Sequence, residues 1–127
     1  MKMLQAVALL FALSISVYAR EVDFNREVRP ILSDKCFRCH GPDKEHRKAK
    51  LRLDLEASAK DPKKKAVVPG NLKESELVYR ITTDDEDDLM PPSDSGISLT
   101  AQEKKLHSKW IAEGAPWSEH WANVGPG

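Results

Sequence analysis

The chain has 127 residues, and its 20 Lys and Arg residues balance its 20 Asp and Glu residues, so the formal net charge is zero. A chain of this length forms at most one modest domain, and a neutral charge balance argues against binding to nucleic acid or to anionic membranes. Aromatic residues make up only 6% of the sequence, so we expect something besides side-chain packing to support the core.

The first 19 residues have the pattern of a secretory signal peptide. Lys2 supplies a positive charge, residues 6–17 are apolar apart from two serines, and Val17-Tyr18-Ala19 fits a small-residue cleavage site. An uncleaved membrane anchor is the alternative, although the apolar stretch is shorter than the roughly 20 residues that span a bilayer. We therefore expect one exported domain over residues 20–127, in the periplasm or another extracytoplasmic space.

An amphipathic helix is expected at the start of this domain. Four apolar residues recur at helical spacing: Phe24, Val28, Ile31 and Leu32. Pro30 has no N–H to donate, so it either limits the regular helix to the residues after Arg29, with an irregular turn before them, or kinks the helix.

Cys36, Cys39 and His40 form a Cys-x-x-Cys-His run directly after this helix. The run is the attachment signature of c-type haem. One helical turn places residues three apart on the same face, so both sulfurs can form thioethers with the two vinyl groups at one porphyrin edge. His40 then lies beside that edge and can turn its imidazole to the iron. The sequence predicts one covalent haem c, bound by Cys36 and Cys39 and ligated by His40.

Three other uses of the two cysteines remain as alternatives. A zinc site needs four protein ligands, and the remaining histidines show no paired spacing. A redox dithiol normally lies at the start of a helix within an alternating strand and helix pattern, which does not surround this pair. A disulfide across two intervening residues closes too small a loop to restrict the unfolded chain much.

The segment after the haem motif is expected to be mainly loop. Residues 44–50 and the lysine run at residues 63–65 are interpreted as exposed loops. Three leucines alternate with charged residues and predict a short extended stretch with one face toward the haem: Leu51, Leu53 and Leu55. Arg52, within this stretch, is either a partner of a haem propionate or an ordinary surface residue.

A second helix is expected over residues 74–81, with Leu77, Val78 and Ile81 on its buried side. The acidic run at residues 84–88 follows it. This run is a docking patch for a basic partner, a negative field beside the iron, or a solvated loop.

Met90 is the predicted second axial ligand of the iron. It lies in a polar, proline-rich stretch and not on an apolar stripe at helical spacing. Pro91 biases Met90 toward an extended backbone, so the loop can present the thioether with little freedom. The alternatives are His46, His107, His120 and an open site, and the choice separates electron transfer from ligand binding or catalysis.

The last predicted helix covers residues 101–113. Thr100 and Glu103 form a capping box at its start, and Gly114 stops it. Trp117 then either folds back over the domain or contacts a partner. The apolar stripe of the helix consists of Leu106, Trp110 and Ile111.

These stretches together resemble the planctomycete-type cytochrome c domain. The resemblance includes the haem motif running into Gly41-Pro42-Asp43, and it covers nearly the whole of residues 20–127. It implies a small all-α fold similar to class I cytochromes c, wrapped around one covalent haem and containing long loops. It also implies thioether bonds at Cys36 and Cys39, with His40 as the proximal ligand and Met90 as the distal ligand. The matching segments are residues 22–24, 29–32, 36–43, 51–54, 68–70, 79–81, 90–92 and 99–117.

We expect an electron-transfer protein and not an enzyme, because such a role needs no side chain that acts as acid, base or nucleophile. Many relatives continue into further domains, whereas this chain stops at Gly127. Its redox donor and acceptor are therefore expected to be separate proteins, and the protein itself a monomer. The alternative is a haem enzyme or gas-binding sensor in which Met90 dissociates to open the iron.

Overall fold

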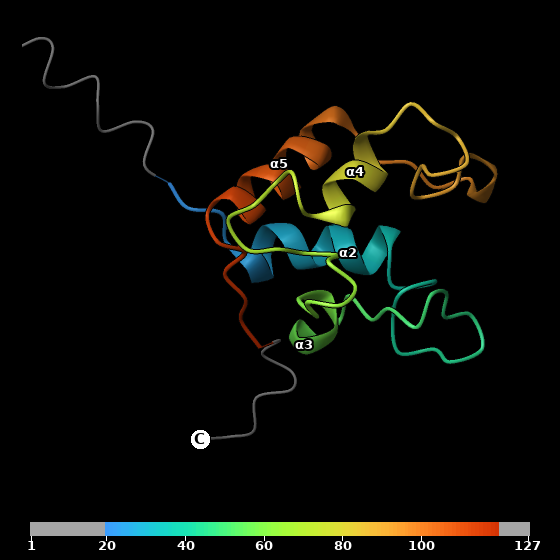
Figure 1. Ribbon diagram of the computed structural model, residues 1–127, viewed down its shortest axis with the longest axis horizontal. Coiled ribbons are helices and arrows are strands. Elements are labelled where there is room, and N and C mark those ends of the chain that lie inside the picture. The colour runs from blue at the N-terminus through green and yellow to red at the C-terminus, as the bar shows by residue number, and fades with distance from the viewer. Residues whose placement is uncertain (1–19, 120–127) are drawn as a thin grey trace, which may run out of the picture.

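A computed structural model describes residues 20–119 of the chain (Figure 1). Within them the backbone forms helices and no strand, so the all-α prediction is confirmed. The predicted signal peptide lies outside the described residues, and none of the described helices is long and apolar enough to cross a membrane. The helical segments are a π-helix at Phe24–Val28, α2 at Arg29–Lys35, α3 at Glu56–Ala59, α4 at Glu76–Thr82, a 3-10 turn at Ser93–Ser95 and α5 at Ala101–Ala112.

The π-helix runs directly into α2. Asp23 caps the π-helix, because its side chain accepts a hydrogen bond from the Arg26 N–H at 3.2 Å. Pro30 lies in the first turn of α2, where its fixed φ is compatible with a helix. Regular helix begins at Arg29, one residue earlier than the first of the two predicted alternatives, and the irregular turn expected before it is the π-helix.

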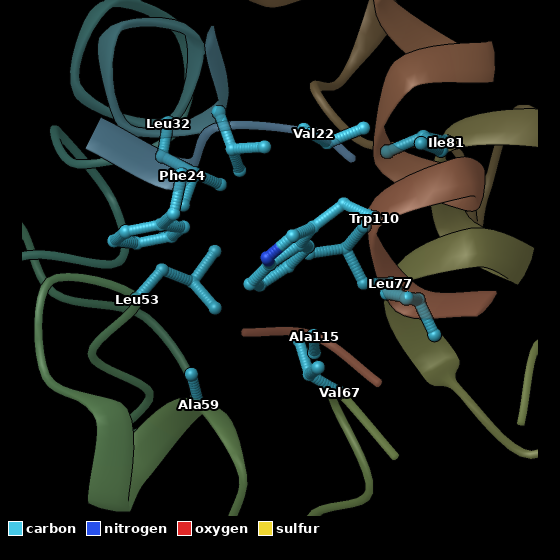
Figure 2. Close-up of a cluster of buried hydrophobic side chains, with 12 residues drawn as sticks. Val22, Phe24, Leu32, Leu53, Ala59, Val67, Leu77, Ile81, Trp110 and Ala115 are labelled. Carbon is cyan, nitrogen blue, oxygen red and sulfur yellow. The ribbon is translucent and has the colours of Figure 1, made fainter. Parts of the chain in front are cut away.

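Helix α5 packs against the π-helix and α4, and the core lies between them (Figure 1). Trp110 is fully buried at the centre of this core and stacks on Phe24, with ring centroids 5.4 Å apart (Figure 2). Trp117 folds back over the domain, with its ring centroid 4.3 Å from that of Phe24. Arg29 lies over Phe24 as well, at 4.8 Å from the ring centroid. These few aromatic rings are concentrated in one cluster, which anchors the C-terminal segment to the N-terminal helix.

The ends of α5 follow the predicted signals. The Thr100 hydroxyl accepts a hydrogen bond from the Glu103 N–H at 3.1 Å, and the Glu103 carboxylate accepts one from the Thr100 N–H at 2.8 Å. This is the predicted capping box. The helix ends at Ala112, one residue before the predicted end, and Gly114 adopts a left-handed φ of 100° that favours glycine.

The predicted extended stretch with an inward face is wrong beyond Leu53. Leu53 is buried, but Leu55 is 45% exposed, because the chain turns after Leu53 and enters α3 at Glu56. Helix α4 also begins two residues later than predicted, at Glu76, although its buried side does contain the predicted residues Leu77 and Ile81.

Removing the Phe24 ring should destabilise the domain strongly. Phe24 is 4% exposed and contacts both Trp110 and Trp117, so Phe24→Ala leaves a cavity and should lower the free energy of unfolding by about 3–5 kcal/mol. Denaturant unfolding measures this. Leu55→Ala, at an exposed position, serves as the control and should change stability by less than about 0.5 kcal/mol. Equal losses in the two variants would contradict the described core.

His107 should make folding stability depend on pH. It is 2% exposed on α5, and its Nδ1–H donates to the Glu103 carbonyl oxygen at 2.7 Å. Burial lowers the pKa of His107 below the ordinary value of 6.5, so the unfolded chain takes up a proton more readily than the folded one. The free energy of unfolding should therefore fall as the pH decreases through and below 6.5.

The measurement is denaturant unfolding of the wild type and of His107→Gln at a series of pH values. The free energy of unfolding should depend less steeply on pH in His107→Gln than in the wild type. The difference in slope should not exceed the contribution of one proton, because the other titrating groups act equally in both proteins. Parallel stability curves for the two proteins would show that His107 does not carry the effect.

Candidate functional site

The cysteine pair lies where α2 ends and the chain tightens into a turn. The Cys36 N–H donates to the Leu32 carbonyl at 2.8 Å, and the His40 N–H donates to the Cys36 carbonyl at 2.9 Å. Residues 36–40 thus occupy one helical turn, which keeps the two sulfurs and the imidazole in one short segment. Both thiols are free.

Gly41 allows the chain to turn sharply directly after His40. A Cβ atom at this position would lie 2.2 Å from the carbonyl oxygen of Phe37, which no side chain tolerates. The glycine is therefore required by a close backbone contact. The sequence pattern marks Gly41 only as part of a turn, since the contact with Phe37 depends on how the motif itself folds.

Cys36, Cys39, His40 and Met90 all line one cavity of about 420 Å³. This volume falls within the range of about 300–1,000 Å³ that is usual for small-molecule and cofactor sites. The structure thus brings the four predicted site residues to one place, although Met90 comes from a loop fifty positions after His40. Much of the remaining wall is apolar and includes Leu51, Leu53, Leu77, Ile81, Pro92 and Ile97.

The backbone of Met90 is held against α4. Its N–H donates to the Arg80 carbonyl oxygen at 2.8 Å, and two prolines follow it. The loop after α4 is therefore fixed at the residue whose thioether lines the cavity.

The other predicted candidates for the second axial ligand do not line this cavity. His46 is exposed, and its Nδ1 lies 2.6 Å from an Asp43 carboxylate oxygen. His107 is buried in the core on α5 and bonds to Glu103. His120 lies outside the described residues.

His40 lies in surroundings that suit a metal ligand. Burial lowers its pKa, which favours the neutral imidazole, while the nearby backbone of Lys48 and Leu51 acts in the opposite direction. Its Nδ1 atom is buried and has no hydrogen-bond partner within the described residues. Such unpaired polar atoms are rare in folded proteins and occur where a water, an ion or a ligand belongs. A neutral imidazole on a cavity wall fits a metal ligand.

The environment of Cys36 argues against a redox dithiol. Burial, reinforced by the charges of Cys39 and Glu103, raises the pKa of the Cys36 thiol to about 12. Thiol–disulfide exchange requires a thiolate, and the raised pKa disfavours the thiolate of Cys36. A metal site of the zinc type also lacks support, because no three His, Cys, Asp or Glu side chains come together in residues 20–119 as such a site requires.

Five charged residues also line the cavity: Lys35, Arg38, Lys64, Glu76 and Arg80. Arg52, one of the options for a propionate partner, does not line it and instead donates to the Asp54 carboxylate at 2.6 and 3.1 Å. Lys64, which the lysine run predicts to lie in an exposed loop, lines the cavity instead. Glu76 and Arg80 are four residues apart on α4, which places both side chains on the same helix face. This spacing is the sequence signal for their shared position on the cavity wall, beside Leu77.

The acidic run at residues 84–88 does not line the cavity. Part of its charge is matched locally, because Asp88 accepts a hydrogen bond from the Tyr79 hydroxyl at 2.8 Å and pairs with Arg80 at 3.3 Å.

Comparison with known proteins gives one match. A family model described as planctomycete cytochrome C matches residues 36–94, which begin at Cys36 and extend past Met90. No curated protein and no solved structure matches the chain. A cytochrome c domain implies bound haem c, and the four residues on the cavity wall are of the types that hold it. Residues 36–94 of this chain therefore match the planctomycete cytochrome C family, from the haem motif to beyond Met90.

Proposed function

We propose that the protein is an exported monohaem cytochrome c that transfers single electrons between separate redox proteins. In this proposal Cys36 and Cys39 form the two thioether bonds, and His40 and Met90 are the axial ligands. The observation that carries it is that these four side chains line one cavity in a chain with a cytochrome c domain.

When bound, haem c supplies an iron that alternates between the ferrous and ferric states. The residues of the chain would determine the position of the haem and how easily its iron changes oxidation state. Cys36 and Cys39 would hold one porphyrin edge, and burial of His40 favours the neutral imidazole, the form that ligates iron. With haem bound, the largely apolar wall around Leu53 and Leu77 would limit contact with water and so the rearrangement of solvent during electron transfer.

Met90 supports the electron-transfer role by its chemistry and by its position. A methionine ligand raises the reduction potential above that of a site with two histidines. The hydrogen bond from the Met90 N–H to the Arg80 carbonyl holds the loop against α4. A site of this kind needs no side chain that acts as acid, base or nucleophile.

A second candidate function has one observation in its favour. Met90 also lines a neighbouring cavity of about 380 Å³, formed with residues of the loop between Leu89 and Lys104. A thioether that left the iron would have room there, and the open position would then take an external ligand. This arrangement would suit a haem enzyme or a gas-binding sensor.

Optical spectra of the purified holoprotein distinguish the two functions. The oxidised wild type should show the near-infrared band of a methionine-to-iron bond, and Met90→Ala should lose it. His46→Ala, at an exposed histidine off the cavity, should keep the band. Met90→His should retain a low-spin iron but lower the reduction potential, because a second imidazole stabilises the ferric state more than a thioether does.

The opposite outcome is a wild-type protein whose iron is high-spin and binds carbon monoxide readily. That result would reject Met90 ligation and favour the second candidate.

A further inference from the structure

The charged residues on the cavity wall fall into two groups according to the segments that carry them. Lys35 and Arg38 belong to the cysteine segment, directly before Cys36 and directly before Cys39. Lys35 is also engaged elsewhere, since its Nζ donates to the Ser98 carbonyl at 3.0 Å. Lys64, Glu76 and Arg80 come from other segments and form the second group.

Backbone hydrogen bonds hold the second group together. The Glu76 N–H donates to the Lys65 carbonyl at 2.8 Å, and the Leu77 N–H donates to the Ala66 carbonyl at 2.9 Å. The start of α4 is therefore joined to the loop that carries Lys64. Arg80 lies one turn further along α4, and its Nε is 3.3 Å from a Glu76 carboxylate oxygen.

The positive charge of this group is only partly neutralised. Arg80 contacts the carboxylates of Glu76 and Asp88, both at 3.3 Å. Strong charge-assisted hydrogen bonds are shorter, at about 2.7–2.9 Å. Lys64 makes no ion pair with the described residues and donates instead to the Lys50 carbonyl oxygen. Two cations with spare hydrogen-bonding capacity thus line a mostly apolar cavity, which suits an anionic group on an otherwise apolar ligand.

The chemistry of haem identifies that anionic group. The porphyrin carries its two propionates at the edge opposite the vinyl groups, so thioether bonds at Cys36 and Cys39 direct the propionates away from the cysteine segment. We propose that Lys64 and Arg80 bind the two propionate carboxylates. Glu76, the acidic residue among the described residues that line the cavity, repels the propionates. This inference rests on the proposed function, because it requires that haem c be attached at these cysteines.

The proposal fixes the sign of each charge effect. A cation beside a propionate favours its ionised form and holds its pKa down, whereas Glu76 raises it. A cation near the iron also favours the ferrous state, which carries less positive charge, so it raises the reduction potential. Removing Lys64 or Arg80 should therefore raise the propionate pKa values and lower the potential, and removing the charge of Glu76 should do the opposite.

The chain offers matched controls in the same two segments. Lys65 and Glu74 pair with each other at 3.2 Å, are about half exposed, and do not line the cavity. Lys65→Gln removes the same charge as Lys64→Gln one residue away, and Glu74→Gln removes the same charge as Glu76→Gln two residues away.

The test uses the holoprotein with isotopically labelled propionate carbons. Nuclear magnetic resonance follows their titration, and voltammetry gives the potential over the same pH range. Lys64→Gln and Arg80→Gln should each raise a propionate pKa and lower the potential, and Lys64→Arg and Arg80→Lys should restore both. Glu76→Gln should shift both quantities in the reverse direction, while the two control variants leave the propionate titration unchanged.

Equal propionate shifts in Lys64→Gln and Lys65→Gln would overturn the proposal, because they would show a general charge effect without contact. Unchanged propionate titrations in all variants would overturn it as well. Either result would leave haem attachment intact, whereas a wild-type protein that acquires no haem c would instead defeat the proposed function.

Discussion

The main constraint on this fold is that the cysteine segment and the Met90 loop meet at one largely apolar cavity. The chain has few aromatic residues, and Phe24, Trp110 and Trp117 gather in the cluster between the π-helix and α5. The cavity of about 420 Å³ that Cys36 and Met90 line is left with a largely apolar wall. Exposed apolar surface is unfavourable in water, so a bound porphyrin would add the hydrophobic contacts that the side chains do not provide.

The two sides of this cavity are joined through the helical core and not by the haem motif alone. The cysteine segment extends from α2, which is continuous with the π-helix that packs on α5. The Met90 loop is tied to α4, which packs on the same helix α5. The relative position of His40 and Met90 therefore depends on α5, even though α5 lies outside the residues that match the family model.

Local signals predicted the parts of the fold that local interactions determine. The capping box at Thr100 depends on hydrogen bonds within a few residues and occurs as predicted, and the change to regular helix lies within one residue of Pro30. The haem motif at Cys36 has the same local character. Met90 was singled out because it fits no helical stripe, and the structure does place it on the cavity wall.

The features that the sequence did not predict depend on contacts between distant segments. Leu55 continues an alternating pattern but turns outward because α3 starts at the next residue. In the sequence, Lys64 is one of three consecutive lysines that cannot be told apart. In the structure, hydrogen bonds between this loop and the start of α4 place Lys64 on the cavity wall and Lys65 off it. Gly41 is required by the carbonyl of Phe37, a contact that exists only once the motif has turned.

The central claim is that Cys36 and Cys39 hold one haem covalently. The most direct measurement is the intact mass, under denaturing conditions, of protein produced together with the cytochrome c maturation machinery, with the haem absorption followed in the same sample. The account predicts a mass increase of one haem that survives denaturation and is absent when both cysteines are replaced by alanine. A wild-type chain with no added mass, or a haem that dissociates on denaturation, would contradict it.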